Sequence, residues 1–460
     1  MVDVELDLAS PRVIHIVGVG GSIMSAFATV FVRMGHRVSG SDLRESKTLD
    51  RLRAEGVTVH VGHVADNVPG DADAVIASTA IATDNPETER ARELGLPVFS
   101  RAETQRAIVA TRRTVAVAGS HGKTTTSSML ALVLREAGWA PSFLIGGNVN
   151  EVGTNAAWDA GDWLVVEADE SDGTFLQFAT DAAVVTNIEP DHLSYWGDFA
   201  SLVAGFERFL DEAHGPWAVS ADDVVARELG AARGGDIVTF GFADDADYLV
   251  RDYVGTRDGS EFALVARGSE LGRVRVPTPG RHNAKNAAAA AAIAMEMGVP
   301  FDAVQRALAR FGGVARRFQR RGERDGVTFV DDYAHLPGEV APMIDAAREG
   351  DWGRVVVVFQ PHRYTRTAAL WRDFAHAFDH ADLLVLTDIY PADEAPQPGV
   401  SGRLILRAVL DAQPALPVVY LPERADLVQH VPRLTRAGDL VLTLGAGDLT
   451  SVPDAWLGEG

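Results

Sequence analysis

The sequence predicts an α/β protein of three domains, each organised around a mostly parallel sheet. Short apolar runs rich in β-branched residues alternate with segments of helical periodicity over most of the chain, which is the pattern of successive βαβ units. The 460 residues are enough for several domains, and the alternation separates into three blocks. We expect domains at residues 1–104, 105–313 and 314–460.

The first block begins with a strand, a glycine turn and a helix. We expect strands at Val13–Val17, Arg37–Ser41, Thr58–Val61 and Asp73–Ser78 and a helix over Met24–Met34. Gly18, Gly20 and Gly21 form the turn and Asp42 closes the second strand, so these four are candidate substrate-binding residues. The amides of such a turn suit a diphosphate, and tight packing alone is the alternative explanation of the two glycines. The turn is also similar to a dinucleotide fingerprint, although Ile23 replaces its third glycine, so an NAD-dependent oxidoreductase is an alternative function.

The second block restarts with the strand Thr114–Ala118. We expect further strands at Trp163–Glu167 and Ala182–Asn187 and helices at Phe199–Glu212, Asn286–Glu296 and Phe301–Arg310. From Asp247 to Val276 apolar and polar residues alternate every second position, in runs too closely spaced for crossover helices. This segment is therefore expected to be a small antiparallel insertion.

A glycine-rich loop joins the strand Thr114–Ala118 to a helix. The candidate nucleotide-binding residues are Gly119, Ser120, His121, Gly122, Lys123, Thr124 and Thr125. The first amides of the helix can hold a phosphate chain, Lys123 can neutralise the terminal phosphates, and the Thr124 hydroxyl can bind Mg2+. The loop is shorter than the general phosphate-binding pattern, but the strand before it and the helix after it favour a nucleotide site.

The metal that accompanies a nucleoside triphosphate needs a carboxylate at the end of a neighbouring strand. Glu167 closes a predicted strand in such a position. Three more acidic residues follow it, namely Asp169, Glu170 and Asp172. The sequence does not decide which of the four ligates the metal, and a solvated acidic loop is the alternative for the last three. His192, after the next strand, is either a metal ligand or a loop histidine.

The third block predicts another parallel sheet. Its expected strands are Val327–Asp331, Arg354–Phe359, Leu383–Asp388, Pro417–Leu421 and Leu440–Leu444. Polar residues follow the first two, and ligands bind at strand carboxyl ends in open α/β sheets. Tyr333, His335, Arg363 and Arg366 are therefore candidate substrate-binding residues. The two arginines suit a carboxylate or phosphate, and a structural ion-pair network is the alternative.

Composition excludes several classes of function. Forty-two basic and 64 acidic side chains give a net charge of −22, which repels nucleic acid and anionic lipid. The absence of cysteine excludes disulfides, thiolate metal sites and cysteine nucleophiles. No stretch approaches the roughly 18 apolar residues of a membrane span, and the chain starts with acidic residues, unlike a signal peptide. We expect a cytoplasmic protein that binds neither nucleic acid nor membranes.

Together these motifs resemble those of the Mur ligase family over almost the whole chain. The motifs in family order are Gly18–Gly21, Gly119–Thr125, Glu167–Asp172, Asn187–His192, Arg281–Asn283, Arg317–Gln319, Asp331–His335, Gln360–Arg366 and Leu444–Asp448. The acidic run Glu167–Asp172 and the run Asp331–His335 are similar to those of the alanine-adding branch. The tripeptide-recycling branch is the nearest alternative.

The resemblance implies a Rossmann-like N-terminal domain for UDP-N-acetylmuramate, a P-loop ATPase-type central domain for ATP, and a Rossmann-like C-terminal domain for the amino acid. It implies a monomer or homodimer that ligates L-alanine to the lactyl carboxylate through an acyl phosphate, in peptidoglycan precursor synthesis. The implied catalytic residues are Lys123, Glu167, His192, His335 and Arg366, and the implied Mg2+ ligands are Thr124, Glu167 and His192. His282 and Asn283 are implied to contact the nucleotide, and Arg317 the substrate.

The chain departs from the alanine-adding branch at two places. Leu336 and Gly338 stand where that branch usually has a second histidine and a threonine, and Ser22-Ile23 stands where Ala-Gly is common in the first turn. L-Alanine, glycine and L-serine therefore stay open as the amino acid. A nucleotide-gated binding protein is a further alternative, and it would need no aligned carboxylates or arginines in the third block.

Overall fold

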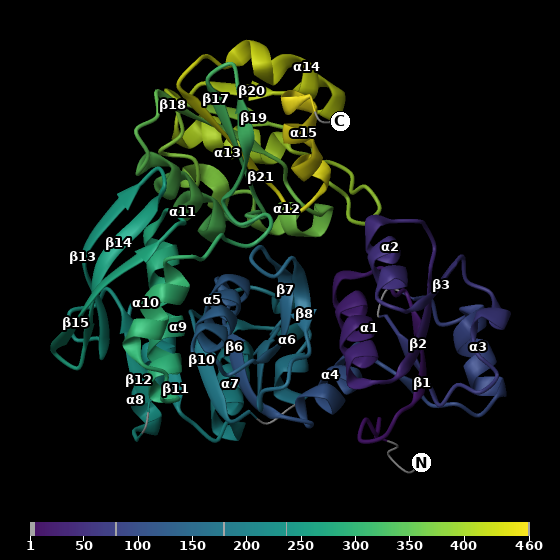
Figure 1. The fold of residues 1–460 in the computed structure, drawn as a ribbon. Coiled ribbons are helices and arrows are strands. Elements are labelled where there is room, and N and C mark those ends of the chain that lie inside the picture. Colours follow the sequence, from purple (N-terminus) through teal and green to yellow (C-terminus); the bar gives the residue numbers. More distant parts are fainter. Residues whose placement is uncertain (1–4, 79–80, 178–179, 236, 459–460) are drawn as a thin grey trace. The chain divides into compact units, whose positions relative to one another are not determined.

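The computed structural model describes residues 5–78, 81–177, 180–235 and 237–458 (Figure 1). By its internal contacts the chain divides into two compact units. Unit 1 comprises Met1–Leu249, Ala266–Ser269 and Asn286–Ala307, and unit 2 comprises Val250–Val265, Glu270–Lys285 and Leu308–Gly460. The sheets in both units are mostly parallel, which confirms the predicted α/β class. The domain boundaries expected near residues 104 and 313 remain predictions.

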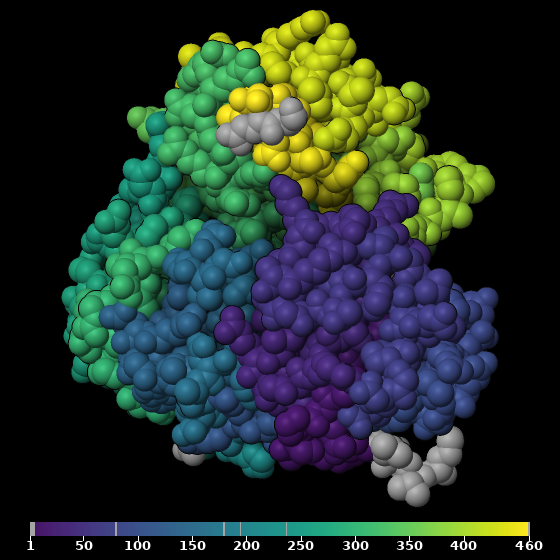
Figure 2. All heavy atoms as spheres, turned by 45° about the vertical axis from the view of Figure 1, so that its right-hand side comes forward, coloured from purple at the N-terminus to yellow at the C-terminus, as the bar shows by residue number. Residues whose placement is uncertain are grey.

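The first sheet of unit 1 is fully parallel, in the order β3-β2-β1-β4-β5. Its elements are β1 (Val13–Val17), α1 (Ser22–Met34), β2 (Arg37–Asp42), α2 (Lys47–Ala54), β3 (Thr58–Val61), β4 (Ala74–Ala77), α3 (Pro86–Glu93), β5 (Val98–Phe99) and α4 (Arg101–Val109). Phe27 and Phe31 of α1 pack in the core with Ile14 and Ile16 of β1. In the space-filling view this part forms a continuous surface, coloured purple to blue (Figure 2). The strand order reverses between β1 and β4, where open sheets bind ligands.

Glu87 of α3 is fully buried against this sheet. Its carboxylate accepts hydrogen bonds from the Ser41 hydroxyl at 2.5 Å and the Asn67 amide at 2.6 Å, and it lies 3.3 Å from His15 Nε2. Burial raises the pKa of a carboxyl group, but the bonds from His15, Ser41 and Asn67 outweigh burial and lower the pKa of Glu87 to about 2. The ionised carboxylate therefore stabilises the fold.

Replacing Glu87 by glutamine is expected to lower the free energy of unfolding by about 3 kcal/mol at neutral pH. Because the pKa is depressed, this contribution is present above the ordinary value of 4.5 and is lost as the pH falls toward about 2. Denaturant unfolding at neutral and at acidic pH measures the difference, which should shrink in acid. Glu93→Gln on the same helix, whose side chain is 67% exposed, is the control. Equal losses in the two variants would contradict the prediction.

The strands of the second sheet that lie in unit 1 follow the order β12-β11-β10-β6-β9-β7-β8. Its elements are β6 (Arg113–Ala118), α5 (Lys123–Glu136), β7 (Ser142–Val149), β8 (Thr154–Ala157), β9 (Trp163–Glu167), β10 (Ala182–Val185), α6 (Leu193–Trp196), α7 (Phe199–Glu212), β11 (Trp217–Ser220), α8 (Val224–Arg233), β12 (Ile237–Gly241) and α10 (Phe301–Leu308). All pairs are parallel except β7 with β8. The first two residues of β13 (Tyr248–Thr256) pair in parallel with β12. Strand β6 lies between β10 and β9, so the carboxyl ends of these three strands meet at one edge.

Unit 2 contains the predicted insertion and the third sheet. Strands β13 (Tyr248–Thr256), β14 (Gly259–Ala266) and β15 (Ser269–Val276) are joined by two-residue turns, so they run antiparallel, as predicted. The first two residues of β13 and the turn between β14 and β15 belong to unit 1. Helix α9 (Arg281–Glu296) follows, and its residues from Asn286 belong to unit 1. It begins before the expected Asn286, since the polar residues that precede the alanine run are helical as well.

The third sheet has the order β16-β17-β21-β18-β19-β20, parallel except for β16 with β17. Its elements are β16 (Gln319–Arg324), β17 (Val327–Asp332), α11 (Pro337–Arg348), β18 (Arg354–Phe359), α12 (Tyr364–Leu370), β19 (Leu383–Leu386), α13 (Arg403–Ala412), β20 (Val418–Tyr420), α14 (Arg424–Leu434), β21 (Asp439–Leu444) and α15 (Val452–Leu457). All five predicted strands are present. Within the described part of the chain, no helix is both long and apolar enough to cross a membrane.

Candidate active site

The loop between β6 and α5 requires glycine at two positions. Gly119 has a φ of +131° and Gly122 a φ of +83°, a region that favours glycine. A Cβ atom on Gly119 would lie 2.1 Å from Thr186 Oγ1. Helix α5 begins at Lys123, and no described side chain caps it at Gly122. Its first amides and its dipole therefore favour an anion such as phosphate.

Asn187, which follows β10, holds this loop in place. Its backbone carbonyl accepts the Ser120 amide at 3.0 Å, and its side-chain oxygen accepts the His121 amide at 2.9 Å. The strand predicted to reach Asn187 ends at Val185, because the side chains of Thr186 and Asn187 both donate to the His121 carbonyl. The two motifs far apart in the sequence thus build one rigid loop.

Lys123 lies beside this loop with its charge paired. Its Nζ donates to the Gly119 carbonyl at 2.6 Å and to Glu170 Oε2 at 2.8 Å. Burial lowers the pKa of Lys123, but Glu170, Asp169 and Glu167 raise it by more, so the ammonium group stays protonated. A polyphosphate in the loop would compete with Glu170 for this cation.

Glu167, at the end of β9, contacts the threonine predicted to bind metal. Its carboxylate accepts the Thr124 hydroxyl at 3.0 Å and the Gly146 amide at 2.7 Å. Among the residues that the structure describes, no group of three or more His, Asp or Glu side chains gathers closely enough to hold a metal ion by itself. One hydroxyl and one carboxylate fit Mg2+ that takes its remaining ligands from phosphate and water. The next residue of α5, Thr125, is buried.

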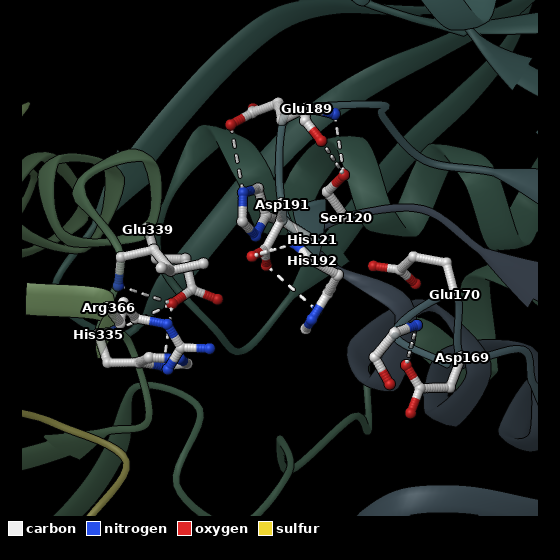
Figure 3. A network of polar contacts seen from close by, with 12 residues as sticks. Ser120, His121, Asp169, Glu170, Glu189, Asp191, His192, His335, Glu339 and Arg366 are labelled. Atoms are coloured by element: carbon white, nitrogen blue, oxygen red, sulfur yellow. Dashed lines mark hydrogen bonds and ion pairs between the residues drawn. The ribbon is translucent and has the colours of Figure 1, made fainter. Parts of the chain in front are cut away.

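His192 is the N-cap residue of α6, on the chain that follows β10, with a φ of +54°. Its Nε2 lies 3.2 Å from Asp191 Oδ2, and His121 Nε2 lies 3.2 Å from Glu189 Oε2 (Figure 3). Both imidazoles are therefore paired with carboxylates. The role of His192 as a metal ligand stays a prediction.

The glycine turn of the first sheet is held by β2. The Gly18 amide donates to the Ser41 carbonyl at 2.8 Å, and the Gly20 amide donates to Asp42 Oδ2 at 2.9 Å. A Cβ atom on Gly20 would lie 2.7 Å from that same oxygen, so the close approach requires glycine. Gly21 precedes α1, which no described side chain caps. The backbone amides at the N-terminus of α1 are therefore suited to bind a diphosphate.

A pocket of about 220 Å³ lies between α1 and Glu167, both in unit 1. Its lining includes Ser22, Ile23, Arg101, Gln105, Gly146, Glu167 and Asp169. Arg101 lies 2.5 Å from Asp172 and 3.6 Å from Asp169, so three of the four acidic residues are engaged by cations, as Glu170 pairs with Lys123. Sequence reasoning did not single out Arg101, because no local pattern marks it.

In unit 2, Tyr333 lies among cations after β17. The guanidinium carbons of Arg316 and Arg317 lie 4.9 Å and 5.3 Å from its ring centroid, within cation–π range. Burial raises the pKa of the neighbouring Asp332 to about 6. Two backbone amides, from Phe318 and from a residue of the same turn, donate to the Asp332 carboxylate and fix this turn.

Arg366 is held by groups that sequence reasoning did not assign. Its Nη1 lies 3.1 Å from His362 Nδ1, and the His362 ring stacks on Tyr390 with centroids 5.8 Å apart. Burial, with His335, Arg366 and Arg363 nearby, lowers the pKa of His362 to about 4, so this imidazole is neutral and accepts from the guanidinium. Arg363 is exposed, and its backbone amide donates to the Tyr390 carbonyl at 2.9 Å. The sequence placed His362 in a polar run but gave no signal for Tyr390.

His282 and Asn283 occupy the first turn of α9. Burial, with Lys285 and Arg317 nearby, lowers the pKa of His282 to about 4. Asn283 Nδ2 donates to the Pro279 carbonyl at 2.7 Å. The structure thus brings His282 near Arg317 within unit 2. The contacts of His282 and Asn283 with a nucleotide, and of Arg317 with the substrate, stay predictions.

Three family models match successive parts of the chain. The model described as Mur ligase family, catalytic domain, matches residues 13–113. Those described as Mur ligase middle domain and Mur ligase, glutamate ligase domain, match residues 117–294 and 316–447. The three matches confirm the predicted three-domain architecture.

Known proteins resemble the chain over nearly its full length. A UDP-N-acetylmuramate–L-alanine ligase of Bradyrhizobium sp. (strain BTAi1 / ATCC BAA-1182) is 44% identical over 446 residues, which cover 95% of each chain. One of Pelotomaculum thermopropionicum is 43% identical over 443 residues, which cover 96% of each chain. The crystal structure of a UDP-N-acetylmuramate-alanine ligase from Thermotoga maritima matches with a TM-score of 0.83 and 29% identity, over 97% of this chain and 98% of that chain.

Proposed function

This chain belongs to the Mur ligase family, and we propose that it ligates L-alanine to the lactyl carboxylate of UDP-N-acetylmuramate in peptidoglycan precursor synthesis, converting ATP to ADP and phosphate. The observation that carries the proposal is the phosphate loop, where the cation of Lys123 and the pair of Thr124 and Glu167 lie at one edge of a parallel sheet. The relatives named above support the choice of substrates.

The first step brings a carboxylate against the γ-phosphate, two anions that repel each other unless cations lie beside them. Lys123 supplies one cation, and the N-terminus of α5 adds a partial positive charge. Bound Mg2+ would neutralise further phosphate charge, with Thr124, Glu167 and His192 as its ligands from this chain. Attack by the carboxylate forms an acyl phosphate and releases ADP.

The second step needs an amine whose own carboxylate is anchored. We assign that anchor to Arg363 and Arg366, because Arg366 is held by His362 at the carboxyl end of the third sheet. The amine attacks the acyl carbon and phosphate leaves. Residues 1–104 bind the UDP-sugar at the glycine turn, 105–313 bind ATP, and 314–460 bind the amino acid. His282 and Asn283 serve the nucleotide, and Arg317 and Tyr333 the substrate.

Phosphate release in the presence of ATP tests this function. The protein should release phosphate only when UDP-N-acetylmuramate and an amino acid are both present, and L-alanine should exceed glycine and L-serine in kcat/KM. A higher kcat/KM for the tripeptide than for L-alanine would indicate that the protein belongs to the tripeptide-recycling branch. A change in nicotinamide absorbance during turnover would indicate an oxidoreductase instead. Because ATP and UDP-N-acetylmuramate are both nucleotides of the cytoplasm, we expect the reaction to take place there. Analytical sedimentation of the protein distinguishes a monomer from a homodimer.

A further inference from the structure

The hydrogen bonds of His335 fix the position of its ring proton. Its Nδ1 lies 3.0 Å from the Tyr333 carbonyl oxygen. The same atom lies 3.3 Å from Glu339 Oε2 (Figure 3). Both oxygens only accept hydrogen bonds, so Nδ1 carries the proton. A neutral imidazole has one protonated nitrogen, which leaves a free lone pair on Nε2.

The His335 ring is also held in orientation. The rings of Tyr333 and His362 meet it edge to face, with centroids 5.4 Å and 5.5 Å away. Glu339, in the first turn of α11, accepts the backbone amides of His335 at 2.9 Å and Leu336 at 3.2 Å. Because these bonds come from backbone amides, they keep the carboxylate beside the imidazole whether or not the ring is protonated. A carboxylate in that place stabilises the imidazolium form once a proton arrives on Nε2.

We infer that His335 is the base that takes the proton from the ammonium group of the incoming amino acid, and that Glu339 is its positioning residue. The inference rests on the proposed function. An α-amino acid carries its ammonium group close to its carboxylate, so an anchor at Arg366 brings that group to the neighbourhood of the His335 ring. Arg366 bonds His362, and the His362 ring contacts His335.

The proton balance is simple. One N–H bond of the ammonium group breaks, an Nε2–H bond forms on His335, and the amine keeps the electron pair. The free amine attacks the acyl carbon, and its surplus proton leaves with the phosphate. No further reactant is needed. Without a base, only the small unprotonated fraction of the amino acid is reactive at neutral pH.

Burial and the charged groups that face His335 determine the pKa of its imidazole. Burial lowers the pKa of His335, Glu339 on α11 raises it, and Arg366 on α12 and Arg317 before β16 lower it further. His362 and Tyr333 complete the surroundings. Together these effects lower the pKa of His335, so its imidazole is unprotonated at neutral pH. His335 can therefore accept a proton without first having to release one.

The variant His335→Asn tests the role of Nε2. The amide nitrogen of asparagine can still donate to the Tyr333 carbonyl, but the variant has no group at the position of Nε2. We expect kcat with L-alanine to fall about 100-fold at neutral pH. The ratio of wild-type kcat to variant kcat should then fall about tenfold for each unit by which the pH rises, because the fraction of L-alanine with a free amine grows by that factor. A ratio of wild-type to variant kcat that stays constant with pH overturns the proposal.

Two further measurements separate a base from a structural group. Hydroxylamine, largely unprotonated at neutral pH, traps an acyl phosphate as a hydroxamate, and His335→Asn should form it at the wild-type rate. If the wild-type protein forms no hydroxamate, the proposed function fails instead. Glu339→Gln should lower kcat about tenfold with little change in the KM for L-alanine, and unchanged kcat would contradict its positioning role. His376→Ala, whose side chain is 71% exposed, is the control and should match wild type throughout.

Discussion

Replacing Lys123 by alanine is expected to lower ATP-dependent phosphate release at least 100-fold. The variant lacks the partly buried cation that lies at the phosphate loop, where two anions must meet. Phosphate release measured with UDP-N-acetylmuramate and L-alanine at saturation checks the prediction. The exposed Lys47 on α2 offers a matched control, and Lys47→Ala should behave as wild type. Retention of more than a tenth of the activity by Lys123→Ala would contradict its role.

Loss of stability must be separated from loss of chemistry in this variant. Glu170 is 1% exposed and is paired with Lys123, so Lys123→Ala leaves a buried charge without its cation, at a cost of about 3 kcal/mol. The double variant Lys123→Ala, Glu170→Gln removes that charge. It should regain most of the lost stability in thermal unfolding while remaining inactive. Recovery of activity together with stability would assign Lys123 a structural role only.

Replacing Arg366 by alanine is expected to raise the KM for L-alanine about 30- to 100-fold, with little change in the KM for ATP. A charge-assisted hydrogen bond to a carboxylate contributes about 2 to 3 kcal/mol, and this variant loses it. Initial rates measured against each substrate in turn give the two KM values. Arg407→Ala, with a side chain that is 73% exposed, is the control. An equal rise in both KM values would exclude carboxylate anchoring by Arg366.

Local sequence patterns predicted the elements and the polar residues at their ends. The phosphate loop could be found because Gly119, Gly122 and Lys123 are close together in sequence and the loop geometry demands them. The sequence could not show which of the four acidic residues ligates the metal, because that depends on which side chains meet between neighbouring strands. The structure brings Glu167 to Thr124 and Glu170 to Lys123.

Two of the groups that sequence reasoning missed differ in kind. Tyr390 contacts His362 from the end of another strand, and spacing carries no record of such a contact. Glu339 lies four residues after His335, so their contact is local, but it forms only because α11 starts at Pro337. At the departure from the alanine-adding branch, Leu336 is buried, so its apolar side chain suits that position. The amino-acid preference remains for the substrate comparison to decide.

The central claim is that ATP phosphorylates the sugar-linked carboxylate before the amine attacks. Transfer of heavy oxygen tests it most directly, using UDP-N-acetylmuramate labelled with 18O in both carboxylate oxygens, unlabelled ATP and L-alanine. An acyl phosphate requires that the carboxylate oxygen which attacks phosphorus leaves with it. We expect one 18O atom in each inorganic phosphate released. Phosphate without label, or label found in AMP, would contradict it.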